Sequence, residues 1–379
     1  MKKTLSMILV LAMIFVMCCA AASAEETFVI GATGPLTGDY ANYGFSMKRG
    51  AEIATEEINA AGGIAGMQIK FLMEDDAADP ETAVNAYNVL MDEGMVASIG
   101  STLSGCCLDL ATESQADGIL MLATTASMKE CVQYPNCFRV CFTDPYQGVL
   151  SADFIADHKI AQKVAIIYDK SNDYSVGITD NFEAEAAVKG LEIVTKQAFT
   201  NQSNTDFSVQ IQACADAGAE LVFLPIYAQE AAYILTQAKS AGLKTTFFGC
   251  DGLDGIVTKI GEENRDACEG VMLLTPFAAD ATDDLTVSFV TKYKEAYGET
   301  PDQFAADGYD AIYVVKAAVE ASGAKPGDAD FNEKVIAAMT TITVNGLTGT
   351  MTWGEDGEVS KTANAVVIKD GVYTVYAAE

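Results

Sequence analysis

Polar side chains suited to binding a small charged molecule follow two of the predicted strands. Ser104 comes after a predicted strand at residues 96–99 and lies at the start of a predicted helix, and Asp251 follows a predicted strand at residues 245–248. The free N–H groups and the dipole at a helix start favour an anion such as a carboxylate. An acidic side chain can pair with an ammonium group. Together the two positions suit a zwitterion, because strand ends are where α/β sheets bind ligands.

Motifs of catalysis are missing from the sequence. It contains no glycine-rich phosphate loop, no Gly-x-Ser-x-Gly elbow, no Cys-x-x-Cys pair and no His-Glu-x-x-His. The single histidine, His158, lies among charged residues typical of a solvated helix end. An enzyme that used Ser104 or Cys106 as its nucleophile would need a general base, and His158 is its only histidine. We therefore predict neither enzyme activity nor a cofactor.

An acidic cluster follows the predicted strand at residues 69–72. Asp75, Asp76 and Asp79 lack the ligand spacing of a calcium loop, so we interpret them as a solvated strand end and predict no metal site. Asp79 stands directly before Pro80, a pairing typical of the N-cap and first position of a helix.

The cysteine pattern predicts a disulfide. Ten cysteines occur in the chain, and an even number in an exported protein permits disulfides. Cys131 and Cys137 flank a turn-rich segment, and we predict a bridge between them. Cys106 and Cys107 lie at the start of a predicted helix, where the dipole can lower the pKa of a thiol. The alternative for these two is simple packing as small apolar residues.

The first residues are typical of an export signal. Two lysines precede an apolar run, and the segment Ala22–Ala24 supplies the small residues that signal peptidase accepts. We predict that residues 1–24 are a signal peptide cleaved after Ala24. The alternatives are an uncleaved membrane anchor and lipidation at Cys18 or Cys19. We expect the protein in the periplasm or outside the cell, with a lipid anchor at the cell surface as a further alternative.

Charge and length narrow the classes of partner and fold. The 379 residues include 53 acidic and 23 basic ones, which gives a formal net charge of −30. A net negative charge of this size repels phosphate backbones and anionic lipid surfaces, so we predict no nucleic-acid partner. Hydrophobic residues make up 50% of the chain, which is typical of a globular protein. The length exceeds what one hydrophobic core usually serves, so we predict two domains.

Short apolar runs alternate with helical stretches, which predicts parallel sheets flanked by helices. Strands are predicted at residues 28–30, 69–72, 96–99, 119–122, 164–168, 191–194, 221–224, 245–248, 351–353, 365–368 and 373–376. Helices are predicted at residues 40–61, 80–93, 102–116, 174–189, 207–217 and 230–241, and they dominate residues 283–338. The return to strands at the end predicts that the chain crosses between domains more than once.

Several runs, taken together and in order, resemble the leucine/isoleucine/valine-binding family, the type I periplasmic binding proteins of branched-chain amino acid ABC transporters. The matching runs include residues 31–35, 57–64, 74–80, 118–121, 138–148 and 238–244. The resemblance implies an α/β fold of two lobes, each a largely parallel sheet flanked by helices. It implies three crossovers, near Thr143, Pro276 and Thr350. Lobe 1 is then residues 25–143 plus 277–350, and lobe 2 is residues 144–276 plus 351–379.

The resemblance also implies a ligand site in the cleft between the lobes. Three first-lobe residues match those that bind the α-carboxylate and ammonium of the ligand, namely Ser104, Thr125 and Ser127. Other cleft positions of the family are matched by Tyr43, Tyr174, Tyr227 and Asp251. Asp251 replaces a Glu found in some branched-chain binders. The alternative is a purely structural role for these residues. Each hydroxyl residue would then be an N-cap or turn residue, and each tyrosine would pack between the lobes.

The function that the resemblance implies is capture and delivery of a small amino acid, branched-chain or similar. The chain would then be an extracytoplasmic solute-binding protein that acts as a monomer and passes its ligand to an ABC transporter permease. The alternative is a ligand-sensing receptor-type binding protein for an amide, an amino acid or another small carboxylate. The identity of the ligand is not fixed by the sequence, because residues scattered through both lobes form the pocket walls.

Overall fold

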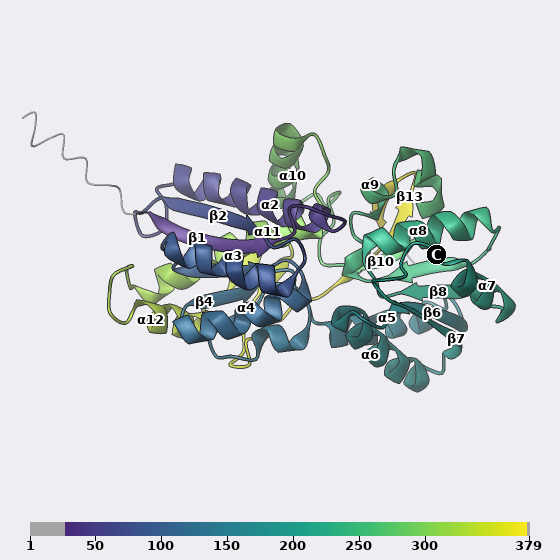
Figure 1. The fold of residues 1–379 in the computed structure, drawn as a ribbon. Coiled ribbons are helices and arrows are strands. Elements are labelled where there is room, and N and C mark those ends of the chain that lie inside the picture. Colours follow the sequence, from purple (N-terminus) through teal and green to yellow (C-terminus); the bar gives the residue numbers. More distant parts are fainter. Residues whose placement is uncertain (1–26, 377–379) are drawn as a thin grey trace, which may run out of the picture.

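The chain folds into two α/β lobes that lie side by side (Figure 1). The structure is a computed structural model and describes residues 27–376, so the predicted signal peptide lies outside the described residues. Each lobe is built on its own sheet, with helices on the faces of the sheet (Figure 1). The predicted fold class of two lobes with largely parallel sheets is confirmed.

The first lobe contains a five-stranded sheet in the order β2-β1-β3-β4-β5, and all its neighbouring strands are parallel. The strands are β1 (Phe28–Gly34), β2 (Ile69–Asp75), β3 (Ala97–Ser101), β4 (Leu120–Ala123) and β5 (Cys137–Arg139). Every residue of β1 is buried, which is typical of a parallel strand covered on both faces. Phe28 and Ile30 join one apolar cluster and Val29 another, because successive side chains point to opposite faces.

Six described helices belong to the first lobe. They are α2 (Ala41–Ala60), α3 (Pro80–Asp92), α4 (Ser104–Asp117), α10 (Asp284–Tyr297), α11 (Gln303–Ser322) and α12 (Phe331–Ala338). A 3-10 turn, η1 (Lys129–Val132), precedes β5, another, η4 (Met339–Thr341), follows α12, and a short hairpin joins β11 (Val344–Gly346) to β12 (Gly349–Met351). Helices α2 and α11 pack closely because Gly50 has no side chain: a Cβ there would lie 1.8 Å from the carbonyl oxygen of Ala305.

The second lobe contains a seven-stranded sheet in the order β14-β13-β10-β9-β8-β6-β7. Its strands are β6 (Lys163–Asp169), β7 (Glu192–Phe199), β8 (Leu221–Leu224), β9 (Thr246–Gly249), β10 (Met272–Thr275), β13 (Asn364–Lys369) and β14 (Val372–Val375). Its helices are α5 (Asp144–Asp157), α6 (Asp173–Lys189), α7 (Ser208–Asp216), α8 (Ala228–Ser240) and α9 (Ile256–Lys259), with 3-10 turns η2 (Asp251–Leu253) and η3 (Glu262–Cys268). Within this described sheet β13 pairs antiparallel with both β10 and β14, whereas the other neighbouring strands are parallel, so the end of the chain returns to the sheet as a hairpin.

Local signals in the sequence explain several element ends. Asp79 is the N-cap of α3, where its side chain accepts a hydrogen bond from the N–H of Thr82 at 2.8 Å, as the Asp79-Pro80 pair predicts. Asp76, however, is not solvated as we predicted. It is fully buried and accepts hydrogen bonds from the hydroxyls of Thr33 and Ser101 at 3.1 and 2.7 Å. Its carboxylate therefore joins the ends of β1 and β3.

Three segments of the chain connect the two lobes. The first leads from β5 into α5, whose N-cap is Thr143, and the second leads from β10 into α10. The third leads from β12 to β13. Near its start, the indole N–H of Trp353 donates to the carbonyl of Arg139 at 2.6 Å, so this part of the segment still packs on the first lobe. The division into lobes therefore stays a proposal, and its third crossing fits better between Glu358, which pairs with Arg139, and β13 than near Thr350.

The predicted Cys131–Cys137 disulfide is not found. Both cysteines are free thiols in the structure, and both are buried. Cys137 begins β5 and its sulfur lies 3.7 Å from the hydroxyl of Ser114, whereas the sulfur of Cys131 lies 3.6 Å from the carbonyl oxygen of Ser104. The turn between the two cysteines thus directs their side chains to different neighbours on α4.

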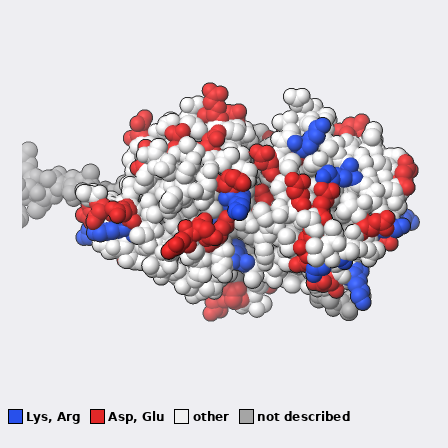
Figure 2. All heavy atoms as spheres, turned by 90° about the horizontal axis from the view of Figure 1, so that it is seen from below, with Lys and Arg blue, Asp and Glu red and all other residues white. Residues whose placement is uncertain are grey.

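Acidic side chains outnumber basic ones on the face of the molecule shown in Figure 2, as the composition implies. Figure 2 shows acidic groups spread over both halves of one face and basic groups in the minority. Among residues 27–376, no helix is long and apolar enough to cross a membrane. Within the same residues no group of three or more His, Cys, Asp or Glu side chains is placed to hold a metal ion.

Candidate functional site

All seven residues predicted to bind a ligand surround one small cavity between the lobes. The described residues that line it are Tyr43, Thr102, Leu103, Ser104, Thr125, Ser127, Tyr174, Tyr227, Asp251, Gly252 and Phe304. The cavity volume is ≈ 10 Å³, about the space that one water molecule needs. The walls therefore approach each other closely, and a molecule of amino-acid size fits only if the two lobes move apart or side chains rearrange.

The first-lobe wall is formed by the segments that follow β3 and β4. Because parallel neighbouring strands end at the same edge of their sheet, these two segments meet. Ser104 is the first residue of α4, and its hydroxyl accepts a hydrogen bond from the N–H of Met128 at 3.3 Å. The hydroxyl of Thr125 donates to the carbonyl of Thr102 at 2.7 Å. These contacts fix hydroxyl groups beside the N-terminus of α4, an environment that favours a carboxylate.

Arg139 supports the first-lobe wall from behind. Its guanidinium is fully buried and donates to the carbonyls of Ala126 and Met128 at 2.6 and 2.8 Å. It also pairs with the carboxylate of Glu358 at 2.8 Å. The loop that carries Ser127 is therefore held by a buried charged group as well as by backbone hydrogen bonds such as that from the N–H of Asp144 to the carbonyl of Ser127.

The second-lobe wall is centred on Asp251, which is the second residue after the end of β9, with Cys250 between them. The hydroxyl of Tyr174 donates to Asp251 Oδ1 at 2.6 Å, and the N–H of Gly252 donates to the same oxygen at 2.7 Å. The N–H of Asp251 donates to the side-chain oxygen of Gln147 at 3.0 Å. A Cβ at Gly252 would lie 2.6 Å from the hydroxyl of Tyr174, so only glycine permits this close approach.

Burial raises the pKa of Asp251 to about 6, although its hydrogen bonds from Tyr174 and Gly252 act in the opposite direction. A second buried acid, Asp144, lies at the first turn of α5, and burial raises its pKa well above the ordinary value. Neither oxygen of Asp144 has a hydrogen-bond partner in the structure. None of the described residues that line the cavity is a Lys, Arg or His. The second-lobe wall therefore suits a positively charged group.

Tyr43 joins the two walls across the cleft. Its hydroxyl donates to the carbonyl of Gly252 at 2.6 Å and accepts from the N–H of Ala228 at 2.7 Å, so one side chain of α2 binds two backbone groups of the second lobe. The rings of Tyr174 and Tyr227 stack with centroids 5.0 Å apart, and Tyr43 lies 5.6 Å from Tyr227 by the same measure. These rings line the cavity and give it apolar walls.

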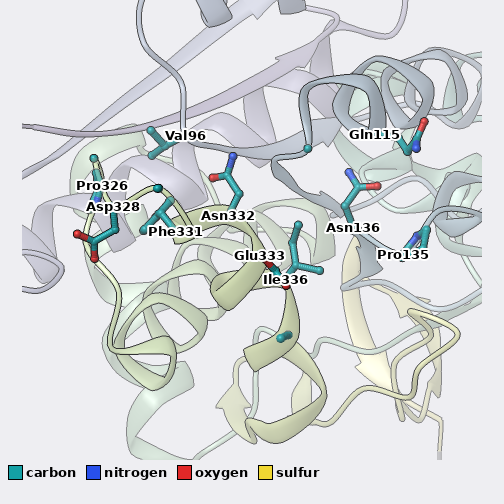
Figure 3. A pocket seen from close by; sticks show the side chains of 14 residues that line it. Val96, Gln115, Pro135, Asn136, Pro326, Asp328, Phe331, Asn332, Glu333 and Ile336 are labelled. Atoms are coloured by element: carbon teal, nitrogen blue, oxygen red, sulfur yellow. The ribbon is translucent and has the colours of Figure 1, made fainter.

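A larger cavity lies at the far end of the first lobe. It has a volume of ≈ 810 Å³ and is lined by α12 and by the segments that lead into β3, β4 and β5 (Figure 3). Figure 3 shows apolar side chains such as Val96, Phe331 and Ile336 together with the carboxamides of Asn136 and Asn332. This is the edge where the parallel strands begin, whereas α/β sheets bind their ligands where strands end. The interlobe cavity is therefore the stronger candidate.

A family model described as "Periplasmic binding protein" matches residues 27–372, nearly all of the described chain. The chain belongs to this family.

Individual relatives agree in sequence and in fold. The chain is 29% identical to the leucine-, isoleucine-, valine-, threonine-, and alanine-binding protein of Pseudomonas aeruginosa, over 89% of this chain and 88% of the relative. It is 31% identical to Leu/Ile/Val-binding protein homolog 2 of Brucella abortus, over 78% of each. It also resembles the crystal structure of the branched-chain amino acid transporter substrate binding protein of Streptococcus pneumoniae in complex with isoleucine. That match has a TM-score of 0.84 and 26% identity and covers 93% of this chain and 99% of the other.

Several residues of this periplasmic binding protein's site were missed by sequence reasoning. Gln147 of α5 accepts from the N–H of Asp251, and the side-chain amide of Gln303 of α11 donates to the carbonyl of Asp251 at 3.0 Å. Burial and the charge of Asp251 raise the pKa of Asp144. Phe304 closes the cavity beside Tyr43, with ring centroids 4.8 Å apart. The only sequence signal for Asp144 and Gln147 was their place in a run that resembles the family, and none pointed to Gln303.

Proposed function

We propose that this protein is an extracytoplasmic solute-binding protein that captures a small amino acid, branched-chain or similar, in the interlobe cleft and delivers it to an ABC transporter permease. The observation that supports this best is the pairing of two unlike walls around one cavity. Hydroxyl groups and a helix N-terminus lie on the first-lobe side, and a buried acid lies on the second-lobe side. The carboxylate of a zwitterion can bind the first-lobe wall while its ammonium group pairs with Asp251, whereas a simple carboxylate leaves Asp251 unpaired.

The roles of the individual residues follow from this arrangement. Ser104, Thr125 and Ser127 bind the α-carboxylate and help to hold the ammonium group, and Asp251 pairs with the ammonium. Tyr43, Tyr174 and Tyr227 enclose the ligand side chain, for which their rings supply apolar surface. This set of residues can bind but offers no nucleophile next to a general base, which agrees with a family of binding proteins rather than enzymes.

The same proposal includes location and partners. The family implies a place outside the cytoplasm and association with an ABC transporter, as the names of the transporter-linked relatives indicate. We propose that the protein acts there as a monomer, after cleavage behind Ala24 or with a lipid anchor at Cys18 or Cys19. The strongly negative surface in Figure 2 supports a protein partner or free solute rather than nucleic acid.

A thermal-shift screen of the purified mature protein against the free amino acids tests the proposed function. A ligand present at 100 times its Kd adds about 2.7 kcal/mol to the free energy of unfolding, which raises the melting temperature by several degrees. We expect one or a few small neutral amino acids to raise it. If none of them does, while a small carboxylate without an ammonium group does, the amino acid assignment is wrong.

A further inference from the structure

A buried acid that is not one of the proposed binding residues lies at a contact between the lobes. Glu230 belongs to the first turn of α8 in the second lobe and is only 3% exposed. Its Oε1 accepts a hydrogen bond at 2.8 Å from the hydroxyl of Tyr40, the N-cap residue of α2 in the first lobe. The same oxygen accepts from the side-chain amide of Asn204 at 3.0 Å. Both donors are neutral, so these contacts hold the carboxylate away from water without supplying a positive charge.

The contact of Tyr40 with Glu230 is part of the packing between the N-terminus of α2 and the first turn of α8. Tyr43, three residues further along α2, binds the N–H of Ala228 at 2.7 Å. The ring of Tyr40 also packs edge-on against that of Tyr227, with centroids 5.3 Å apart. Because α2 belongs to the first lobe and α8 to the second, these contacts exist only while the cleft is closed.

Closing the cleft therefore removes the carboxylate of Glu230 from water. Burial raises its pKa above the ordinary value and the charge of Asp169 acts in the same direction, although the two hydrogen bonds oppose the shift. The neighbouring amino group of Lys259 binds the carbonyl oxygen of Asp39 instead. The dipole of α8 stabilises the carboxylate in the open and the closed state alike, so it does not offset the loss of water. Burying a charge that lacks a cation is costly, and the charge of Glu230 thus favours the open state.

We propose that Glu230 opposes closure of the cleft and promotes release of the bound molecule, and that the hydroxyl of Tyr40 limits this effect by giving the buried carboxylate a donor. Delivery requires release as well as capture, so a group that returns to water on opening suits a protein that passes its ligand on. The inference rests on the proposed function only in that the cleft opens and closes around a solute. It holds for any ligand of the cleft, because the two side chains act on the balance between open and closed states.

Substitutions at the two ends of this hydrogen bond should have opposite effects. Tyr40→Phe keeps the ring but leaves the buried carboxylate one donor short, so we expect Kd to rise about tenfold or more and dissociation to become faster. Glu230→Gln keeps an oxygen that accepts from Tyr40 but removes the charge, so Kd should fall about threefold or more and dissociation should become slower. A contact that only stabilises the closed cleft would weaken binding in both variants.

Glu57 and Tyr313 provide a matched control pair inside the first lobe. The hydroxyl of Tyr313 on α11 donates to Glu57 Oε2 on α2 at 2.8 Å, the same length as the bond between Tyr40 and Glu230. Neither control residue lines the interlobe cavity. Glu57→Gln and Tyr313→Phe should therefore leave Kd and the dissociation rate unchanged, even where they lower the melting temperature.

Stopped-flow fluorescence with L-isoleucine, L-valine and L-alanine as probes measures the association and dissociation rates in the wild type and the four variants. Thermal melting shows that each variant is folded. We expect Kd to rise in Tyr40→Phe, to fall in Glu230→Gln and to stay the same in the control pair. Changes in the same direction in Tyr40→Phe and Glu230→Gln, or no change in either, would overturn the proposal.

Small-angle scattering of the proteins without ligand separates this inference from the proposed function. Glu230→Gln favours the closed state and Tyr40→Phe the open state, so the radius of gyration should be smaller in the first variant than in the second. If none of the amino acid probes binds but the radii differ in this way, the role of Glu230 stands and the proposed ligands are wrong. Equal radii in the two variants contradict a role for Glu230 in opposing closure.

Discussion

The carboxylate of Asp251 is held in place by donors from its own lobe and has no cation beside it among the described cavity residues. We predict that Asp251→Asn weakens binding of the amino acid by about two to four orders of magnitude. Removing one partner of a buried ion pair costs about 3–5 kcal/mol, because the other charge is left uncompensated. Calorimetric titration of the wild type and the variant measures the change.

The melting temperature of the same variant without ligand is the control. Burial raises the pKa of Asp251 to about 6, so at pH 7 its charged form is less favourable in the folded protein than in water. Asp251→Asn should therefore leave the stability unchanged or raise it. Near-normal affinity, within about threefold, together with a lower stability would show that Asp251 is only a turn residue after β9.

Tyr43→Phe isolates the hydroxyl that joins the lobes. The ring stays, but the bonds to the carbonyl of Gly252 and the N–H of Ala228 are lost, which leaves two buried backbone groups of the second lobe without partners when the cleft closes. Each unpaired group costs about 1–3 kcal/mol, so we predict that Kd rises at least tenfold.

Tyr87→Phe is the matched control, because its buried hydroxyl bonds to Asp117 within the first lobe, away from the cleft. It should lower the melting temperature without changing Kd. If both variants change Kd equally, the effect of Tyr43→Phe reflects general stability and not the contact across the cleft.

The residues that sequence reasoning identified lie in places where local chemistry gives a signal. Ser104 begins a helix and Asp251 follows a strand, and the family motifs add Thr125, Ser127 and the tyrosines. Gln303 gave no such signal, because it reaches Asp251 only after α11 packs against the other lobe. The predicted Cys131–Cys137 bond was wrong for the same reason: closeness along the chain favoured it, whereas the packing on α4 directs the sulfur of Cys131 to the carbonyl of Ser104 and that of Cys137 to the hydroxyl of Ser114.

At the scale of elements, the N-terminus of α11 is capped from the other lobe. The N–H of Gln303 donates to Asp254 Oδ2 at 2.9 Å, while Asp302, the N-cap of α11 itself, accepts from the N–H of Ala305 at 3.0 Å. Closing the cleft therefore brings two carboxylates together. Burial and the charge of Asp302 raise the pKa of Asp254 to about 7, and Tyr373 and Gly255 are its other neighbours.

This contact predicts that affinity depends on pH. In an open cleft Asp254 is exposed to water and its pKa is near the ordinary value of about 3.9. The closed state then binds more protons between that value and about 7, so closure is favoured as the pH falls through 7 and disfavoured as it rises. We expect Kd at pH 8 to be about tenfold weaker than at pH 6.

Asp302→Asn should flatten this pH profile. Asparagine is a good N-cap and its amide can donate to the hydroxyl of Ser46, which Asp302 now accepts from at 2.7 Å, but it carries no charge beside Asp254. Asp76→Asn, which changes a buried acid confined to the first lobe, should keep the slope of the wild type. Equal slopes in all three proteins would show that other groups set the pH dependence.

Most of the longer elements could be predicted from hydrophobic periodicity, and several short ones were missed. The strand β8 (Leu221–Leu224) has the predicted bounds, and α6 differs by one residue at its start. The short strands β5 and β10 and the helix α5 were not predicted. In α5 the buried polar residues Asp144 and Gln147 interrupt the apolar pattern, because they pack against other elements of the site.

At the scale of the whole molecule, each lobe supplies part of the site and neither supplies all of it. Contacts across the cleft include the hydroxyl of Tyr40 on Glu230 at 2.8 Å as well as those of Tyr43. Because the cavity of ≈ 10 Å³ is too small to hold an amino acid, we predict that the lobes open to admit it.

Small-angle scattering tests this motion. The shared ligand favours the closed state, so we expect a smaller radius of gyration at saturation than in the ligand-free protein. Tyr43→Phe, which weakens closure, should shift the ligand-free profile further toward the larger radius. An unchanged profile of the wild type at saturation would contradict a cleft that closes.

The most direct test of the central claim is the calorimetric comparison of one amino acid with its two halves. The amino acid that stabilises the protein most is titrated into the wild type at pH 7, followed by the carboxylic acid that lacks its ammonium group and by the amine that lacks its carboxylate. We predict one site per chain for the amino acid and a Kd at least 100-fold weaker for each half, because each leaves one wall without its partner. Equal affinity for the amino acid and the carboxylic acid would contradict a site built to bind a zwitterion.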